Sequence, residues 1–447
     1  MGLGRLFPAP PQGPHACWTG YFTSRPALKG YVRDTSSVFQ ASKQIQFFGQ
    51  PPYDISPANY LYRLERAMGV TQHHDSVSGT SKQHVAYDYA RRLAWGREDA
   101  QAGNKAALAT LTRFAGDYAT CDLSNATICP ALESPALNTP ILVTVWNQQS
   151  QNASAVPMRL PAALVSGVTN YKVTGPDGAD VTAQLVPASA ADSALRTNYY
   201  GAAAVPMTWV CFQAAAPALG FANYFLTPVA SAAEAPLTHV SRPRTAKLRA
   251  DQTLTNGIVT LTFAAATGLL SNFADSSTGV NVPLVQTWFY YNSSVGDAPN
   301  DGTGDYGQAS GAYIMRTNTS TEFPLRNGTT GSVTIITGPV VNEARMSCAD
   351  ADWVTQSVRL WAGAHEADVE MTVGPVPRGP APQGREIVTR YASNLVTASQ
   401  WQTDSNIRDM MNRTRDFRPT WPYQVYEPIA GNCELRRVVE PFLCRSG

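Results

Sequence analysis

The stretch Gln72-His73-His74-Asp75-Ser76-Val77-Ser78-Gly79-Thr80 is a polar connection between two segments with helical spacing. It holds two of the chain's six histidines side by side, with a carboxylate directly after them. No other stretch of the sequence concentrates side chains that can bind a metal ion and exchange a proton. Because polar loops before helices often contain His and Asp, the cluster is either a metal site or an ordinary loop.

Two helices are predicted before this stretch. Thr23 and Ser24 are suitable capping residues for the first helix, and Pro26 fits its first turn. The inward face of this helix has the three- and four-residue spacing of a bundle seam, formed by Leu28, Tyr31, Thr35, Val38, Ser42 and Ile45. The second helix begins at Ser56-Pro57, and its apolar stripe consists of Leu61, Leu64 and Met68.

The third helix is predicted to follow the polar stretch directly. Thr80-Ser81-Lys82-Gln83 has the pattern of a capping box, in which the Thr hydroxyl and the Gln amide each bond to the backbone of the other. The predicted apolar face starts with Val85, Tyr89 and Leu93 and continues past a weak point at Gly103. Three helices with short connections predict a three-helix bundle that holds the polar stretch between two helices.

From about Pro140 the hydrophobic period changes from helical to alternating. Strands are predicted at 141–146, 171–175, 181–185, 208–212 and 221–226 and, beyond an Ala-rich linker at 230–235, at 258–263, 285–291, 333–336, 354–361, 367–373 and 386–390. We therefore predict an α+β multidomain chain, in which the three-helix bundle precedes a small β-sandwich and a large antiparallel β-sandwich. The predicted boundaries are 21–118 for the bundle, 119–139 for a linker, 140–229 for the small sandwich and 230–447 for the large one.

The composition excludes two kinds of partner. The 447 residues include 34 basic and 33 acidic side chains, so the net charge is only +1 and no nucleic-acid partner is expected. No apolar run is long enough to span a bilayer. Six Asn-x-Ser/Thr sequons point to the secretory route, although the first residues do not have the pattern of a signal peptide.

Cysteine placement also points to an oxidising compartment. Of the seven cysteines, Cys121 and Cys129 lie on either side of the sequon at Asn125, in a short polar segment closed by Pro130. This arrangement favours a small disulfide loop over two unrelated thiols. An odd number of cysteines leaves at least one unpaired.

Several blocks of the sequence resemble glycoside hydrolase family 38, and most closely its lysosomal, or acid, α-mannosidase branch. In the helical part the resemblance lies in residues 18–29, 67–85 and 88–91 and in the Cys121–Cys129 loop. In the β part it lies in residues 308–314, 356–360, 373–377, 403–406, 415–421 and 427–432. The blocks occur in order from about Gly13 to Asn432, which implies the family's helical and β-sandwich domains.

The resemblance gives the polar stretch specific roles. By position, His74 is the residue that ligates the family's zinc ion, and Asp75 contacts the mannose hydroxyls beside the metal. Tyr313, in the Ser-Gly-Ala-Tyr block, is similar to a tyrosine that reaches the sugar from the β region, although it could equally be a packed strand tyrosine. His73 is expected to support or pack beside the site, and His84 to have no metal role. The implied cofactor is Zn²⁺, and the implied partners are mannose-containing glycans.

The resemblance also implies what lies outside this sequence. The family carries its nucleophile, general acid and other zinc ligands in an α/β domain that precedes the bundle, so residues 1–20 are expected to be the end of that domain. We assign no catalytic residue within this chain and expect it to be a fragment, truncated at both ends, of a retaining exo-α-mannosidase of the lysosome, the vacuole or the secretory route. The missing catalytic domain is then a possible partner. The alternative is a non-catalytic carbohydrate-binding or assembly module.

Overall fold

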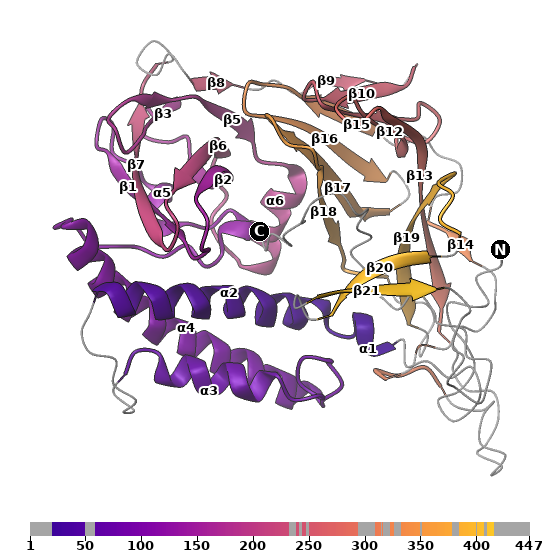
Figure 1. The fold of residues 1–447 in the computed structure, drawn as a ribbon, viewed down its shortest axis with the longest axis horizontal. Helices are drawn as coiled ribbons and strands as arrows, with labels where there is room; N and C mark the ends of the chain where they lie inside the picture. Colours follow the sequence, from indigo (N-terminus) through magenta and orange to yellow (C-terminus); the bar gives the residue numbers. More distant parts are fainter. Residues whose placement is uncertain are drawn as a thin grey trace.

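A computed structural model shows a helical layer beneath two β-sandwiches (Figure 1). The structure describes residues 20–49, 59–231, 238–240, 244–246, 250–293, 309–313, 315, 322–325, 332–348, 351–377, 384–398, 400–405 and 409–414. The statements below concern these residues. Within them, no helix is both long enough and apolar enough to cross a membrane.

The helical layer is built as the sequence predicts. It consists of the short helix α1 (Gly20–Thr23) and the long helices α2 (Pro26–Gly49), α3 (Tyr62–Thr71) and α4 (Gln83–Thr112). Helix α2 begins at Pro26, whose fixed φ suits a first turn. The bundle core is apolar and fully buried, with Leu28, Val32, Leu61, Leu64, Leu93 and Ala100 among its members. The predicted start of the second helix at Ser56-Pro57 lies outside the described residues.

One local prediction for the third helix was wrong. The capping box does not form, because the N-cap of α4 is Lys82 and it makes no side-chain cap bond. The hydroxyl of Thr80 bonds instead to the carboxylate of Asp75. The helix continues through Gly103 as predicted, and a Cβ there would lie 2.6–2.7 Å from side-chain atoms of Gln46 and Tyr60. This glycine therefore serves close packing, and its helix-weakening effect is overridden.

A disulfide-closed segment joins the bundle to the small sandwich. Cys121 and Cys129 form the predicted disulfide around the turn η2 (Ser124–Ala126), and the short helix α5 (Pro130–Glu133) follows. The buried guanidinium of Arg196 forms a two-point pair with Glu133 and also donates to the carbonyl of Thr127, at 2.6 Å. The linker is thereby fixed to the small sandwich at two places.

The small sandwich consists of two sheets. One has the order β1-β7-β3-β4 and the other β2-β6-β5-β8. The strands are β1 (Ile141–Asn147), β2 (Ala153–Ala163), β3 (Asn170–Thr174), β4 (Asp180–Val181), β5 (Ala183–Pro187), β6 (Met207–Ala216), β7 (Gly220–Val229) and β8 (Thr238–Val240). The helical turns α6 (Ala190–Ala194) and η3 (Leu195–Tyr199) separate β5 from β6.

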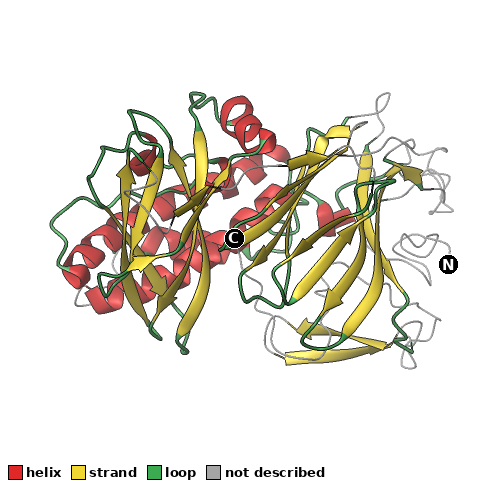
Figure 2. Cartoon of the chain, turned by 90° about the horizontal axis from the view of Figure 1, so that it is seen from above, coloured by secondary structure: helices red, strands yellow, loops and turns green. Residues whose placement is uncertain are grey.

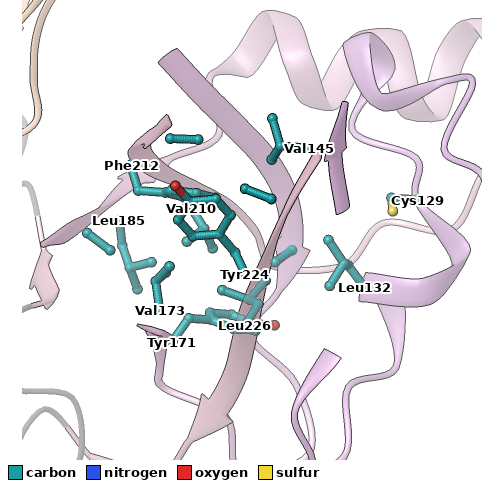
Figure 3. Packing of buried hydrophobic residues seen from close by; sticks show 14 of the residues in the cluster. Cys129, Leu132, Val145, Tyr171, Val173, Leu185, Val210, Phe212, Tyr224 and Leu226 are labelled. Atoms are coloured by element: carbon teal, nitrogen blue, oxygen red, sulfur yellow. The ribbon is translucent and has the colours of Figure 1, made fainter. Parts of the chain in front are cut away.

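The core of the small sandwich lies between its sheets, where Tyr171, Leu185, Phe212, Tyr224 and Leu226 point toward one another (Figure 3). The predicted strand at 181–185 is divided by the structure. Its first residue, Val181, belongs to β4, which pairs with β3, and its last three residues belong to β5 in the opposite sheet. Strand β8 lies beyond the predicted boundary at 229 and pairs in parallel with β5.

The large sandwich also consists of two sheets. One has the order β10-β11-β12-β13-β14, with β19 paired to β13, and the other has the order β18-β17-β16-β15-β9. The strands are β9 (Arg244–Ala246), β10 (Gln252–Thr255), β11 (Val259–Phe263), β12 (Leu270–Asp275), β13 (Val280–Asn292), β14 (Phe323–Pro324), β15 (Ser332–Ile336), β16 (Val341–Cys348), β17 (Ala351–Trp361), β18 (Asp368–Val373) and β19 (Arg385–Ser393). The hairpin β20 (Gln400–Ser405) and β21 (Asp409–Thr414) pairs with itself.

The two sandwiches lie side by side (Figure 2) and share a buried contact. Gln184 of the small sandwich is fully buried, and its amide bonds to the backbone of Val340 and Val341 at 2.9–3.1 Å. Trp209 and Trp361 belong to the apolar cluster around this contact. The observed helices and antiparallel sheets confirm the predicted fold class.

Candidate metal and sugar site

The His-His-Asp stretch forms a compact loop between α3 and α4. Helix α3 ends at Thr71, and the loop then makes successive turns through the bonds from Ser76 N to His73 O (2.8 Å) and from Gly79 N to Ser76 O (2.9 Å). Gly79 has φ of +75°, a conformation that a residue with a Cβ rarely adopts. The loop is therefore held in shape by its own backbone before α4 begins.

The loop brings the three predicted side chains together. One possible ligand atom from each of His73, His74 and Asp75 lies within 4.8 Å of the others, and within the described ranges this is the one such group of three or more. Asp75 Oδ2 is 3.6 Å from His73 Nε2 and 3.8 Å from His74 Nε2. These separations are too long for direct hydrogen bonds. The side chain of His74 is 85% exposed.

The two oxygens of Asp75 have different surroundings. Oδ1 accepts hydrogen bonds from the hydroxyls of Thr80, at 2.7 Å, and Tyr313, at 2.8 Å. These two bonds, with Thr80 the larger contributor, hold the pKa of the Asp75 carboxyl below its usual range. Asp75 is therefore a carboxylate at neutral pH, with Oδ1 fixed by hydroxyls and Oδ2 facing the imidazoles.

Tyr313 reaches the site from the β region. It lies in a bend outside the strands, is 42% exposed, and bonds to a carboxylate 238 residues away in the sequence. The alternative of a packed strand tyrosine was therefore wrong. The contact joins the helical bundle to the large sandwich at the site.

Sequence reasoning missed the supporting hydroxyls. Ser81 Oγ donates to the backbone carbonyl of Asp75 at 2.7 Å, and Ser78 Oγ donates to that of His74. The sequence pattern predicts Thr80 only as a helix cap. His84 is exposed on the first turn of α4 and does not belong to the cluster, whereas His73 lies as close to Asp75 as His74 does.

Comparison with known families identifies the chain. The family described as "Alpha mannosidase middle domain" matches residues 16–111, which include the bundle and the His-His-Asp loop. The family described as "Glycosyl hydrolases family 38 C-terminal domain" matches residues 254–440, which include Tyr313. The chain belongs to glycoside hydrolase family 38. The Asp75–Tyr313 bond thus joins the family's middle and C-terminal domains.

Relatives in this family cover almost the whole chain. A probable α-mannosidase of Arabidopsis thaliana is 34% identical over 451 residues, which is 94% of this chain and 41% of that protein. The lysosomal α-mannosidase of Homo sapiens is 36% identical over 427 residues, 94% of this chain and 39% of that protein. The chain spans about two fifths of the length of these curated relatives.

Two solved structures have a similar fold. A glycosyl hydrolase family 38 protein from Enterococcus faecalis superposes with a TM-score of 0.56 at 12% identity, covering 89% of this chain and 48% of that one. An α-mannosidase from Enterococcus faecalis V583 gives a TM-score of 0.54, covering 90% and 46%. At this identity the likeness supports the fold alone.

Proposed function

We propose that the chain forms the helical and β-sandwich part of a zinc-dependent retaining exo-α-mannosidase that removes terminal α-mannose from N-glycans and oligosaccharides. The observation that carries the proposal is the bond from Tyr313 to Asp75 beside two imidazoles. It gathers the ligand types expected for a zinc ion and for sugar hydroxyls on one exposed surface. The family names and the α-mannosidase relatives support the substrate class.

The donor set fits zinc. Imidazole nitrogen and carboxylate oxygen are both common zinc ligands, and zinc sites that bind substrate keep an open position. His74 is the proposed ligand, because it is the more exposed of the two imidazoles. His73 would then flank it, 4.3 Å away between ring centroids. When bound, zinc would act as a Lewis acid that orients and polarises sugar oxygens.

Asp75 and Tyr313 are the proposed sugar contacts. A carboxylate is a pure acceptor, so Oδ2 of Asp75 can receive hydrogen bonds from mannose hydroxyls. The tyrosine and threonine hydroxyls keep the carboxylate charged and prevent it from turning away. The polarity and exposure of the site suit a hydrophilic ligand.

The carboxylates that would perform the reaction are not assigned within this chain. Retaining glycoside hydrolysis needs a nucleophilic carboxylate and a second carboxyl group about 5–5.5 Å away that acts as acid and base. Asp75 is the only carboxylate in the cluster found among the described residues. Because its pKa is lowered, it is ionised at neutral pH and holds no proton to donate. We propose that both reacting groups come from another domain of a longer protein.

We also propose that the protein acts in the lysosome or vacuole, or after secretion. The relatives named as lysosomal α-mannosidases support this location, as does the Cys121–Cys129 disulfide.

The test measures zinc and mannoside binding by the purified chain. Because the family's other zinc ligands lie outside this sequence, we expect zinc titration to show weak binding that is lost in His74→Ala and retained in His84→Ala, the matched control. We expect calorimetric binding of methyl α-mannoside to require zinc and Asp75.

Two results would redirect the proposal. Mannoside binding that persists unchanged without zinc and in His74→Ala would favour the non-catalytic carbohydrate-binding module. Robust cleavage of an aryl α-mannoside by these 447 residues alone would refute the assignment of the reacting carboxylates to another domain.

A further inference from the structure

One ten-residue segment touches both halves of the candidate site. Residues 20–29 comprise α1, the turn after it and the first residues of α2, and they lie at the end of the bundle nearest the large sandwich (Figure 1). We propose that Arg25, with Ser24 and Lys29, is a positioning residue that fixes the His-His-Asp loop against Tyr313. The expected effect on zinc binding rests on the proposed function, whereas the positioning of the loop can be tested without it.

Three side chains of this segment bond to carbonyls of the loop. Ser24 Oγ donates to Gly79 O at 2.7 Å, Arg25 Nη1 donates to the same oxygen, and Lys29 Nζ donates to Val77 O at 2.7 Å. Two of the donors are cationic, which strengthens a hydrogen bond to a carbonyl. Lys29 is partly buried, and this burial lowers the pKa of its amine to about 8.

The backbones of the two segments also fit closely. A Cβ on Gly79 would overlap the carbonyl oxygen of Ser24, so the loop approaches the segment more closely than any other residue would permit. Arg25 itself has φ of 50°, the left-handed region that residues other than Gly, Asn and Asp rarely adopt. Such a conformation persists only where surrounding contacts impose it. Here it directs the guanidinium at the loop.

The same segment holds the tyrosine side of the site. Tyr21 N donates to the backbone carbonyl of Tyr313 at 3.3 Å. Burial raises the pKa of Glu386, which lies on β19 of the large sandwich, and the nearby Thr23 side chain partly offsets that rise. Arg25 Nη2 reaches Gln83 Oε1, the first residue of α4, at 3.2 Å. The segment thereby ties the loop, the third helix and the Tyr313 bend to one another.

The donors of this segment also hold the Asp75–Tyr313 bond in place. That bond is 2.8 Å long and joins two bodies that the chain connects only through the small sandwich. Without the donors of Ser24, Arg25 and Lys29, the carbonyls of Val77 and Gly79 would turn to water. The loop would then lose the register that places Asp75 Oδ1 at the tyrosine hydroxyl.

The experiment compares Arg25→Ala, Arg25→Lys and the control Arg33→Ala in the full 447-residue chain. Arg33 is exposed on α2, about two turns after Arg25. Hydrogen exchange of the Ser76 and Gly79 amides reports the loop without requiring a metal, and zinc titration reports the site. We expect Arg25→Ala to speed loop exchange and weaken zinc binding by roughly tenfold or more each, with exchange in the β core unchanged. Arg25→Lys should recover part of both, because it keeps a cationic donor.

Each outcome decides the proposal. Unchanged loop exchange in Arg25→Ala would overturn it, even if the wild-type chain binds zinc. If the wild-type chain binds no zinc, the proposed metal role fails while loop exchange still tests the positioning role. If Arg25→Ala does not fold, Lys29→Met gives the same readout through the carbonyl of Val77. If a variant lowers the free energy of global unfolding but leaves exchange of the Ser76 and Gly79 amides unchanged, the residue has a merely structural role and the proposal is overturned.

Discussion

A close backbone approach between α3 and α4 offers a sharp test of the packing of the bundle. Gly96 of α4 faces Leu64 of α3, and a Cβ at Gly96 would lie 2.6 Å from Leu64 Cα and 2.8 Å from Leu64 N. Ordinary contact begins at 3.4 Å, so Gly96→Ala forces the helices apart by about 0.8 Å. The atoms in the way are backbone, which cannot rotate aside. Leu64 itself is fully buried.

Two opposing effects set the magnitude. Replacing Gly by Ala inside a helix stabilises it by about 1 kcal/mol. Overpacking a close contact costs about 1–3 kcal/mol. Gly69→Ala in α3 is the matched control, since no atom lies within 4 Å of its Cβ and only the favourable effect applies. We therefore expect Gly96→Ala to be less stable than Gly69→Ala by about 1–3 kcal/mol.

Urea unfolding followed by circular dichroism at 222 nm measures the difference, because the bundle dominates the helical signal. The same displacement would reach the site, since α3 ends at Thr71, directly before the His-His-Asp loop. Equal stabilisation by Gly96→Ala and Gly69→Ala would refute the packing of α3 against α4 described above.

Three further predictions concern the linker and the site. Arg196→Met should lower the free energy of unfolding by about 3 kcal/mol or less, because Glu133 keeps some water contact. Arg196 also lowers the pKa of Glu133. The stabilisation by this pair is therefore present above pH about 4.3 and is lost as the pH falls through the pKa of Glu133 in the folded chain. The urea unfolding curves of the wild-type chain and the variant should converge in acid. Replacing the Cys121–Cys129 disulfide by two serines should cost about 2–3 kcal/mol in thermal unfolding, from its sequence separation of 8. Tyr313→Phe should raise the pKa of Asp75 toward its ordinary value, and an unchanged carbon-13 titration of the metal-free chain would contradict the bond.

The bundle was predictable because its signals are local. The seam of α2 and the stripe of α3 follow from helical spacing, and Leu28, Leu61 and Leu64 are buried as expected. The face of α4 was predicted only in part, since Leu93 is buried as expected but Val85 is only partly buried and its neighbour Ala86 is buried. Small residues allow α4 to approach its neighbours closely, which a pattern of large apolar residues does not reveal.

The site was only partly predictable, because its contacts connect distant parts of the chain. Adjacent histidines and a carboxylate are visible in the sequence, but their bonding partners are not. Tyr313 was found through resemblance, and the hydroxyl of Thr80 was assigned to a helix cap. Nothing in the sequence indicates that Arg25 adopts a positive φ and reaches Gly79, since its partner lies 54 residues away.

The position of the site gives the small sandwich a part in its function. Asp75 belongs to the bundle and Tyr313 to the large sandwich, so a ligand that needs both is bound only while these bodies are docked. The small sandwich contacts each of them: Trp146 donates to Gln44 of α2 at 3.0 Å, and Gln184 bonds to the backbone of the large sandwich. Three bodies that each touch the other two form a closed arrangement, in which loosening one contact shifts the others. A change at Gln184, although it lies in neither half of the site, should therefore weaken binding at Asp75 more than an exposed change on the same sandwich.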